Sequence, residues 1–322
     1  MRPRCRTISA AIAAFVILIV CWTTAQSAEF TVEKTDRGVT VKLDGQPFTE
    51  YLIRSGNKPI LWPLIGPNGV PLTREYPMRT VAGESHDHPH HRSLWFTHGI
   101  VNGIDFWGES ANGGEIRHRE FAEVQGGPQA RIVAIDDWLG HDGHKVCEDR
   151  RTLVFHAADG QRIIDFDIRF TATDGPLVFG DTKEGSFGLR VADWLKVDAP
   201  GHGQIINSTG QTDAAAWGQR ADWVDYHAPH DAQTLGIAIL NHPSSFRYPT
   251  YWHVRTYGLF AANPFGKSDF TGTKSQPDGS ATVEAGKSLV FRYRVILHEG
   301  DEKAAHIADA FAAYAKERFD GK

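Results

Sequence analysis

Histidine is concentrated in one short stretch, HDHPHHRSLWFTHG (86–99), which holds five of the 16 histidines of the chain within 13 residues. Imidazole titrates near neutrality and is the commonest metal ligand in proteins. Pro89 is incompatible with an ordinary central strand, and the spacing does not match the HExxH pattern of helical zinc sites. Crowding disfavours protonation, so we expect some rings to be neutral near pH 7, which suits metal ligation or general-base catalysis.

Two kinds of site fit this stretch, and a solvated polar loop is the alternative to both. In an extended backbone His86, His88 and His90 share one face, where they could bind zinc, iron or copper, while Asp87 and His91 point away. The other kind is a metal-free polar site built from histidine, arginine and asparagine. The flanking segments WPLIGP, RSLWF and HGIVNGIDFW are aromatic and apolar, which favours a walled cleft over a solvent-facing loop.

A second group of polar residues lies in LNHPSSFRYPTYWHVRTYGLFAANPFG (240–266). If WHVRTYG is an extended strand, His253, Arg255 and Tyr257 share one face, opposite Val254 and Thr256. Such a polar face is unfavourable in a core unless it lines a polar cavity, and an exposed sheet face is the alternative.

Arginine and tryptophan supply further candidates. In FGLRVADWLKV, Arg190 and Asp193 interrupt an apolar run, and a structural ion pair is the alternative to a binding role. The chain also has nine tryptophans. Tryptophan stacks on the C–H faces of pyranose rings, while polar side chains bind the hydroxyl groups. Packing in the core is the alternative, and we expect it for at least half of the tryptophans.

The elements that must position these residues are mainly strands. FTVEKTDRGVTVKLDGQPFTEYLI alternates apolar and polar residues around DRG and LDGQ, the pattern of half-buried hairpins. No GxGxxG opens a helix and no regular βαβ alternation occurs, which argues against a doubly wound sheet. We predict an all-β fold, a large antiparallel two-sheet sandwich, in a single domain over residues 29–322.

One amphipathic helix is expected over residues 301–319, after the last strand. Ile307, Phe311, Ala315 and Phe319 form an apolar stripe at i+4 spacing, and Asp301 is a suitable N-cap. This stripe would pack against the edge or back of a sheet.

Residues 1–28 have the composition of a secretory signal peptide: a basic start, the apolar run AAIAAFVILIVCW and the small residues of TTAQSA. The apolar run is too short for a membrane span, and cleavage is expected after Ala25 or Ala28. The mature chain then has 31 basic and 39 acidic residues, a formal net charge of −8. This acidity argues against nucleic acid as a partner. We predict an exported protein, periplasmic or extracellular, whose mature chain has no membrane span.

Three segments, 58–78, 84–107 and 240–266, resemble a bacterial family of exported proteins that is labelled PmoA-like and nominally consists of methane oxygenases. The string HDHPHHRSLWF-x-HG-x-VNG-x-DFW is specific to that family. The resemblance implies a galactose-mutarotase-like supersandwich and an association with sugar oxidoreductases and other carbohydrate-degrading proteins. A methane monooxygenase subunit of that name is an integral membrane protein, whereas the mature chain has no apolar run of membrane-spanning length.

We therefore predict an exported carbohydrate-active enzyme that transfers protons on a saccharide, of the lyase, hydrolase or epimerase type. A non-catalytic saccharide-binding protein is the main alternative, and a copper oxidoreductase is a lesser one. The residues predicted to act in catalysis are His88, His91, Arg92, His253 and Arg255. Those predicted to bind the saccharide are His98, Asn102, Asp105, Trp107, Arg190, Asn241, His242, Tyr257 and Asn263. Those predicted to bind a divalent metal are His86, His88 and His90.

Overall fold

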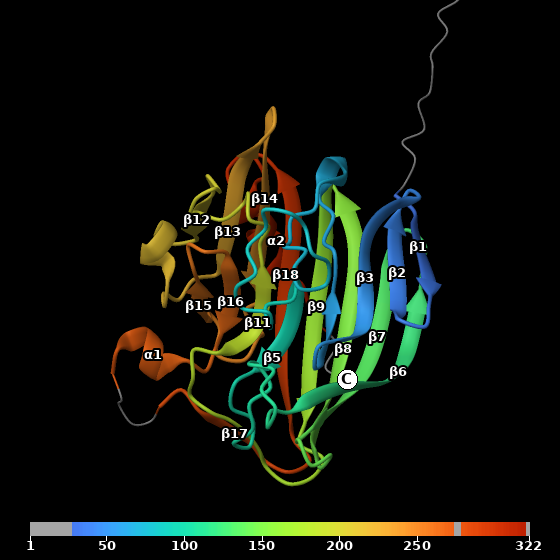
Figure 1. Cartoon of the computed structure of the whole chain (residues 1–322), viewed down its shortest axis with the longest axis vertical. Coiled ribbons are helices and arrows are strands. Elements are labelled where there is room, and N and C mark those ends of the chain that lie inside the picture. Colours follow the sequence, from blue (N-terminus) through green and yellow to red (C-terminus); the bar gives the residue numbers. More distant parts are fainter. Residues whose placement is uncertain (1–27, 274–277, 320–322) are drawn as a thin grey trace, which may run out of the picture.

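The computed structural model describes residues 28–273 and 278–319, so the predicted leader lies outside the described residues except for Ala28. In the described part of the chain, two eight-stranded antiparallel sheets pack face to face, as Figure 1 shows. A small sheet of β10 (Leu177–Phe179) and β17 (Ala281–Val283) is also present. The prediction of a large antiparallel two-sheet sandwich is confirmed.

The first sheet has the order β1-β2-β3-β4-β5-β11-β16-β15 and so combines strands from both halves of the chain. Its strands are β1 (Phe30–Lys34), β2 (Gly38–Leu43), β3 (Gln46–Ser55), β4 (Lys58–Leu61), β5 (Leu94–His98), β11 (Gly185–Arg190), β15 (Tyr251–Val254) and β16 (Leu259–Asn263). Strands β1 to β3 are the hairpins that the alternating pattern predicts. Asp44 and Gly45 form the turn between β2 and β3 with φ angles of 50° and 76°.

The second sheet has the order β12-β13-β14-β18-β9-β8-β7-β6. Its strands are β6 (Glu115–Gln125), β7 (Ala130–Leu139), β8 (Lys145–Ala158), β9 (Gln161–Thr171), β12 (Gln204–Asn207), β13 (Trp223–His230), β14 (Gln233–Asn241) and β18 (Ser288–Glu299). In the described ranges the helical elements are α1 (Lys267–Thr271), α2 (Ile307–Tyr314) and two 3-10 turns, Pro67–Gly69 and Asp213–Ala216. None of these described helices is long and apolar enough to cross a bilayer.

Apolar side chains that alternate along the strands fill the space between the sheets. On β5, Leu94 and Phe96 face this core, whereas Trp95 belongs to a separate cluster on the outer face of the first sheet. The ring centroid of Phe96 lies 5.3 Å from that of Phe170 and 5.5 Å from that of Phe291, both on the second sheet. The alternation thus fixes which side chains are available to a site outside the sandwich.

The core also contains a charged cluster. The Arg151 guanidinium is 1% exposed and forms ion pairs with Asp136 (3.1 Å) and Asp149 (2.9 Å), both fully buried. Trp138 donates its indole N–H to Asp149 (2.6 Å), and Tyr51 on the first sheet donates its hydroxyl to Asp136 (3.2 Å). The cluster therefore links the two sheets by a hydrogen bond as well as by apolar packing.

The C-terminal helix is shorter than the predicted range of 301–319. It begins at Ile307 because His306 has a left-handed conformation with φ of 53°, and it ends at Tyr314. The preceding residues form turns, in which the Asp301 carboxylate accepts hydrogen bonds from two backbone N–H groups. The helix packs on the outer face of the second sheet, as predicted for its apolar stripe. The short α1 has no counterpart among the predicted elements.

Candidate functional site

A cavity of about 710 Å³ lies on the outer face of the first sheet. Eight of the predicted site residues line it together: His88, His90, His91, Asp105, Trp107, His253, Arg255 and Tyr257. The other lining residues are Gly99, Gly108, Thr182, Lys183 and Glu184. Side chains from four separate parts of the sequence therefore meet at one place.

The sheet supports this cavity through a row of residues that pair across neighbouring strands. Trp95 on β5 pairs with Gly188 on β11, Gly188 pairs with Ala261 on β16, and Ala261 pairs with His253 on β15. A Cβ atom on Gly188 would lie 2.6 Å from the Trp95 indole, so only glycine lets that ring lie flat on the sheet. The His91 ring stacks on Trp95 with centroids 5.5 Å apart.

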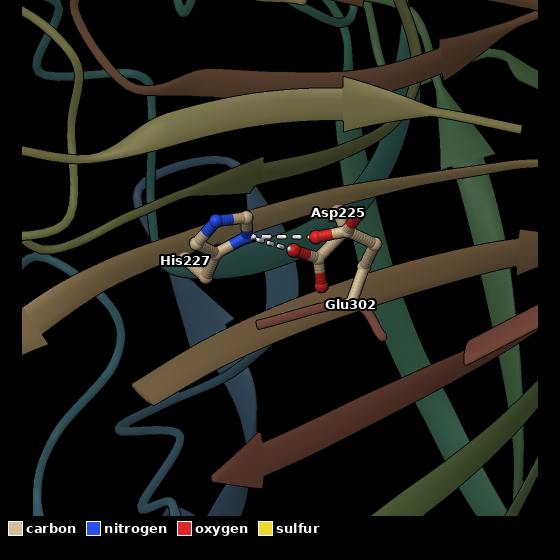
Figure 2. Close-up of side chains that lie close together, drawn as sticks. All are labelled: Asp225, His227 and Glu302. Atoms are coloured by element: carbon tan, nitrogen blue, oxygen red, sulfur yellow. Dashed lines mark hydrogen bonds and ion pairs between the residues drawn. The ribbon is translucent and has the colours of Figure 1, made fainter. Parts of the chain in front are cut away.

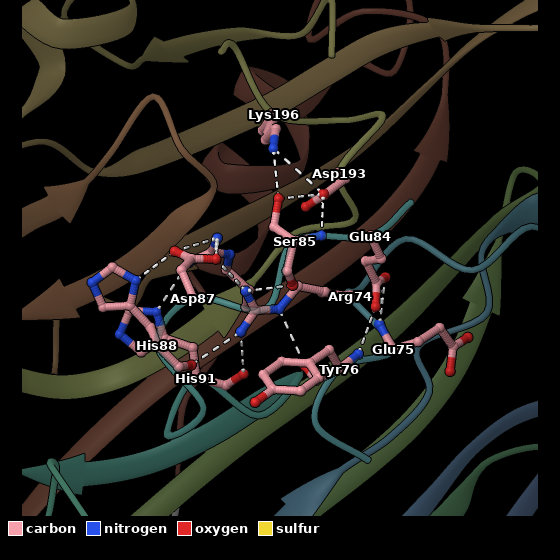
Figure 3. Close-up of polar contacts among 11 residues, drawn as sticks. Arg74, Glu75, Tyr76, Glu84, Ser85, Asp87, His88, His91, Asp193 and Lys196 are labelled. Atoms are coloured by element: carbon pink, nitrogen blue, oxygen red, sulfur yellow. Dashed lines mark hydrogen bonds and ion pairs between the residues drawn. The ribbon is translucent and has the colours of Figure 1, made fainter. Parts of the chain in front are cut away.

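Residues 85–91, here called the histidine loop, are wound around the buried guanidinium of Arg74 (Figure 3). Its nitrogen atoms donate to the carbonyl oxygens of Ser85 (3.4 Å), His88 (3.0 Å) and His91 (3.4 Å). His88 itself has a positive φ of 44°. A loop with no strand partners must satisfy its carbonyl groups in another way, and the five N–H donors of arginine do so here.

The backbone of this stretch is not extended, so its side chains are distributed differently from those of an extended chain. His91 faces the cavity together with His88 and His90, although an extended chain would place it on the opposite side. The rings of His88 and His91 are parallel, with centroids 4.7 Å apart. His88 is also parallel to Tyr257 at 5.1 Å. These stacked rings form one aromatic wall of the cavity.

Asp87 lies behind this wall, and its charged carboxylate orients the His88 ring. Its carboxylate accepts hydrogen bonds from Arg74 (2.7 Å), Arg190 (2.8 and 3.0 Å) and His88 Nδ1. Burial acts to raise the pKa of Asp87, but the hydrogen bond from His88 and the charges of Arg190 and Arg74 outweigh this and lower it to about 2. Asp87 is therefore ionised and keeps the Nδ1 proton on His88.

His91 lines the cavity as a neutral imidazole whose ring proton is on Nε2. Its Nδ1 lies 3.2 Å from the Arg190 guanidinium, which can only donate, so Nδ1 accepts and the ring proton is on Nε2. Burial, together with the charge of Arg190, holds the pKa of His91 well below its ordinary value.

His253 is neutral in the opposite tautomer. Its Nδ1 lies 2.8 Å from the backbone carbonyl oxygen of Lys183, which can only accept, so Nδ1 carries the proton and Nε2 has a free lone pair. Burial lowers the pKa of His253 to about 4, against the opposing charge of Glu184. His90 is also neutral, because burial and the Lys58 charge lower its pKa to about 4. The cavity thus offers both an imidazole acceptor and an imidazole donor.

The strand predicted over WHVRTYG ends earlier than expected. β15 stops at Val254, and residues 255–258 turn back into β16, with Arg255 N–H donating to the Leu259 carbonyl (2.8 Å). Gly258 has a φ of 103°, which closes the turn. His253, Arg255 and Tyr257 nevertheless all line the cavity, because the turn projects over it.

The cavity carries two cationic side chains. Lys183 pairs with the neighbouring Glu184, whereas the exposed Arg255 has no carboxylate partner among the described residues. The Arg255 guanidinium instead lies 5.6 Å from the centre of the Tyr257 ring. An unpaired guanidinium at the mouth of a cavity can bind a carboxylate or an enolate oxygen of a ligand.

Four predicted residues surround the cavity without lining it. Arg190 is buried beneath it, where it orients His91 and Asp87 rather than forming the Asp193 pair considered above. Asp193 instead accepts hydrogen bonds from Ser85. Arg92 forms two hydrogen bonds with Glu109 (2.7 and 2.9 Å) and Asn263 donates to the Thr182 carbonyl (2.9 Å). The His86 ring stacks on Tyr76 at 4.4 Å.

Four others have structural contacts elsewhere, so we no longer assign them to a binding role. His98 lies between the sheets, and Asn102 joins a loop to β10 through Val178 N–H (2.6 Å). Asn241 accepts from Thr250 N–H (3.1 Å), and His242 packs against α2 on the outer face of the second sheet. None of the four lines the cavity.

Residues 182–184 and the role of Asp87 were not predicted from the sequence. Lys183 and Glu184 directly precede β11, and charged residues before a buried strand are common at protein surfaces, so their types gave no signal. The metal predicted at His86, His88 and His90 stays a prediction. Among the described residues, no three possible ligand atoms of the histidine loop lie close enough together to bind one ion. To bind a metal with His88 and His90, the His86 ring would have to leave its stack on Tyr76.

The buried His98 predicts a dependence of stability on pH. Its Nε2–H donates to the Gly180 carbonyl (2.8 Å), and burial lowers its pKa to about 4. Below about pH 6.5 the unfolded chain binds a proton that the folded chain does not, so the free energy of unfolding falls as the pH drops toward 4. Between pH 7 and pH 4, the free energy of unfolding of His98→Gln should fall by about 3 kcal/mol less than that of the parent protein. The measurement is urea denaturation at the two pH values. Equal losses in both proteins would contradict the assignment.

The fold and the cavity define a two-sheet β-sandwich protein with a histidine-lined cavity on the outer face of one sheet. The chain belongs to the family of unknown function DUF6807, whose model matches residues 38–312. This match does not confirm the PmoA-like label. No curated protein sequence matches the chain.

Several solved structures are similar in fold. The family GH36 alpha-galactosidase AgaB from Geobacillus stearothermophilus has a TM-score of 0.41 and 11% identity, over 87% of this chain and 40% of that chain. An alpha-galactosidase from Lactobacillus brevis has a TM-score of 0.38 and 10% identity, over 84% and 40%. A galactose mutarotase related enzyme from Lactobacillus acidophilus has a TM-score of 0.36 and 9% identity, over 84% and 97%. The chain thus spans 40% of the length of these two alpha-galactosidases.

Proposed function

We propose that this protein is an exported enzyme that transfers protons on a saccharide bound in the cavity, with lyase, hydrolase or epimerase chemistry. The observation that carries the proposal is the pair of neutral imidazoles with opposite tautomers. His253 presents a free Nε2 lone pair, and His91 presents an Nε2–H group. One can take a proton from the substrate or from water, while the other donates a hydrogen bond to the oxygen on which charge develops.

The other lining residues supply binding and charge stabilisation. Trp107 and Tyr257 contribute apolar ring surface to the lining, which can contact the C–H groups of a sugar. Arg255 holds an oxygen that becomes negative during the reaction, and Lys183 is the second cation in reach of it. Asp105, whose carboxylate accepts from Trp107 N–H (2.7 Å) and Gly108 N–H (3.0 Å), shapes the loop that carries Trp107.

The test follows proton transfer directly and needs no knowledge of the final product. The protein is incubated with panels of mono- and oligosaccharides in D₂O, and incorporation of deuterium at carbon or cleavage of the sugar is followed by NMR and mass spectrometry. We expect the activity to stay constant from pH 7 to about 5 and to fall only near pH 4, where His253 becomes protonated. An acid limb near pH 6.5 would show that another, unperturbed group is the base.

Two results would replace the proposal with one of its alternatives. Sugar binding by calorimetry without exchange or cleavage for any ligand would identify a saccharide-binding protein, which needs no matched acid and base. Copper-dependent oxidation of a substrate would identify an oxidoreductase instead.

A further inference from the structure

A second cluster of ligand-type side chains lies away from the cavity, on the outer face of the second sheet. Asp225, His227 and Glu302 each offer one atom, and these three atoms lie within 4.8 Å of one another (Figure 2). Asp225 and His227 come from β13, whereas Glu302 comes from the turns that precede α2. All three residues are buried.

The sheet makes room for this cluster with a glycine in a central strand. His227 on β13 pairs with Gly236 on β14, and Gly236 pairs with His298 on β18. A Cβ atom at position 236 would lie 2.3 Å from the His298 ring and 3.0 Å from the His227 Cβ. Glycine weakens a strand interior, and it marks a place where side chains from both neighbours approach closely.

The candidate ligand atoms lie close together. His227 Nδ1 lies 2.7 Å from an oxygen of Asp225 and 3.8 Å from an oxygen of Glu302. The second oxygen of Asp225 accepts a hydrogen bond from His298 Nε2 (2.6 Å), which fixes the orientation of the carboxylate. Such a partner behind a ligand is a regular feature of metal sites.

Glu302 completes the cluster with a carboxylate that is only loosely held. Its side chain is 10% exposed, and within the described residues it forms no hydrogen bond. Its nearest basic groups are His227 Nδ1 and Lys303 Nζ, each 3.8 Å away. Its oxygens are not among the fully buried polar atoms, so solvent reaches them, and a cation could take the place of that solvent.

We propose that Asp225, His227 and Glu302 form a binding site for one divalent transition-metal ion of the zinc type. One imidazole nitrogen and two carboxylate oxygens make a set of three protein ligands, which leaves a fourth position for water. At bond lengths of about 2.0 Å, tetrahedral ligand atoms are roughly 3.3 Å apart. The distances from His227 Nδ1 to Asp225 (2.7 Å) and to Glu302 (3.8 Å) each lie near that spacing. His227 Nδ1 releases its proton when the metal binds.

The metal would connect elements that are otherwise joined by packing. Two ligands are on β13, in the second sheet, and the third is on the segment that leads from β18 into α2. An ion that binds the folded chain only adds its binding free energy to stability. The site is distinct from the histidine loop, and the proposal is independent of the catalytic proposal above.

The experiment uses tag-free mature protein, treated with EDTA, dialysed and then incubated with zinc chloride. We expect one zinc per chain by inductively coupled plasma mass spectrometry and a rise in Tm of roughly 5–10 °C in excess zinc. Two variants test the ligands: Glu302→Gln removes the carboxylate charge, and His227→Asn keeps an N–H donor toward Asp225 while it removes the imidazole. Both should bind less than one tenth of the zinc and lose the rise in Tm.

Two controls separate this site from others. His156→Asn removes a histidine that is paired with Asp165 (3.0 Å) on the same sheet but has no third ligand, and it should keep the zinc. His88→Asn and His90→Asn report on the histidine loop. The proposal is overturned if wild-type protein binds no zinc, or if folded Glu302→Gln and His227→Asn retain it while the histidine-loop variants lose it.

Discussion

His253→Asn and His91→Asn should each reduce turnover by about 10²–10⁴-fold while the protein stays folded. Asparagine places its amide group near the position of imidazole Nδ1. At position 253 it can still donate to the Lys183 carbonyl, and at position 91 it can still accept from Arg190. Each substitution therefore keeps the contact made by Nδ1 and removes the remainder of the imidazole, including Nε2. Turnover is measured by the deuterium-exchange or cleavage assay with the substrate that the screen identifies.

The matched substitutions His253→Gln and His91→Gln complete this test. Glutamine places an amide near Nε2 and gives up the contact behind the ring. At position 91 its N–H can still donate to the substrate, so partial activity is expected, whereas at position 253 an amide cannot act as a base and activity stays low. If both asparagine variants keep full turnover and lose only stability, the two histidines are structural and the proposed mechanism is wrong.

Arg151→Met should lower the free energy of unfolding by about 3–5 kcal/mol. The guanidinium is buried between Asp136 and Asp149, and both carboxylates are fully buried. Removing the cation leaves two buried like charges without compensation, although methionine fills much of the same volume. The measurement is equilibrium denaturation in guanidinium chloride at pH 7, with the m-value compared between the variant and the parent.

Arg119→Met is the control for this substitution, because Arg119 also pairs with two carboxylates but is 37% exposed. Its loss should change stability by less than about 0.5 kcal/mol, since solvent screens such pairs. Tyr51→Phe should cost about 1–2 kcal/mol, because it leaves one oxygen of Asp136 without a donor from the first sheet. A loss below 1 kcal/mol for Arg151→Met would show that water reaches the two carboxylates.

Local sequence patterns predicted the strands but not their neighbours. The alternation over residues 30–53 identifies β1 to β3 because half-buried strands have a period of two residues. Nothing local places β11 between β5 and β16, since that order depends on contacts between segments far apart in the chain. The start of α2 was also missed, because the left-handed φ of His306 is not encoded by its apolar stripe.

The residue types of the cavity were predictable, but their directions were not. The histidine, arginine and tyrosine side chains of two segments were expected to meet, and the structure brings them to one cavity. Alternation in an extended chain failed for His91, because His88 has a positive φ and Arg74 holds the loop carbonyls. Arg74 precedes the histidine loop and lies outside it. No pattern within the loop therefore indicated its role.

The guanidinium of Arg74 inside the histidine loop has a thermodynamic consequence for ligand binding. Loops that become ordered only when a ligand arrives lose conformational entropy, and this loss reduces the observed affinity. Here the carbonyl groups of residues 85, 88 and 91 are already paired in the free protein. The aromatic wall of the cavity is therefore in place before a ligand enters. Binding does not have to order this loop, so the favourable enthalpy of the ligand's contacts is not offset by a loss of loop entropy.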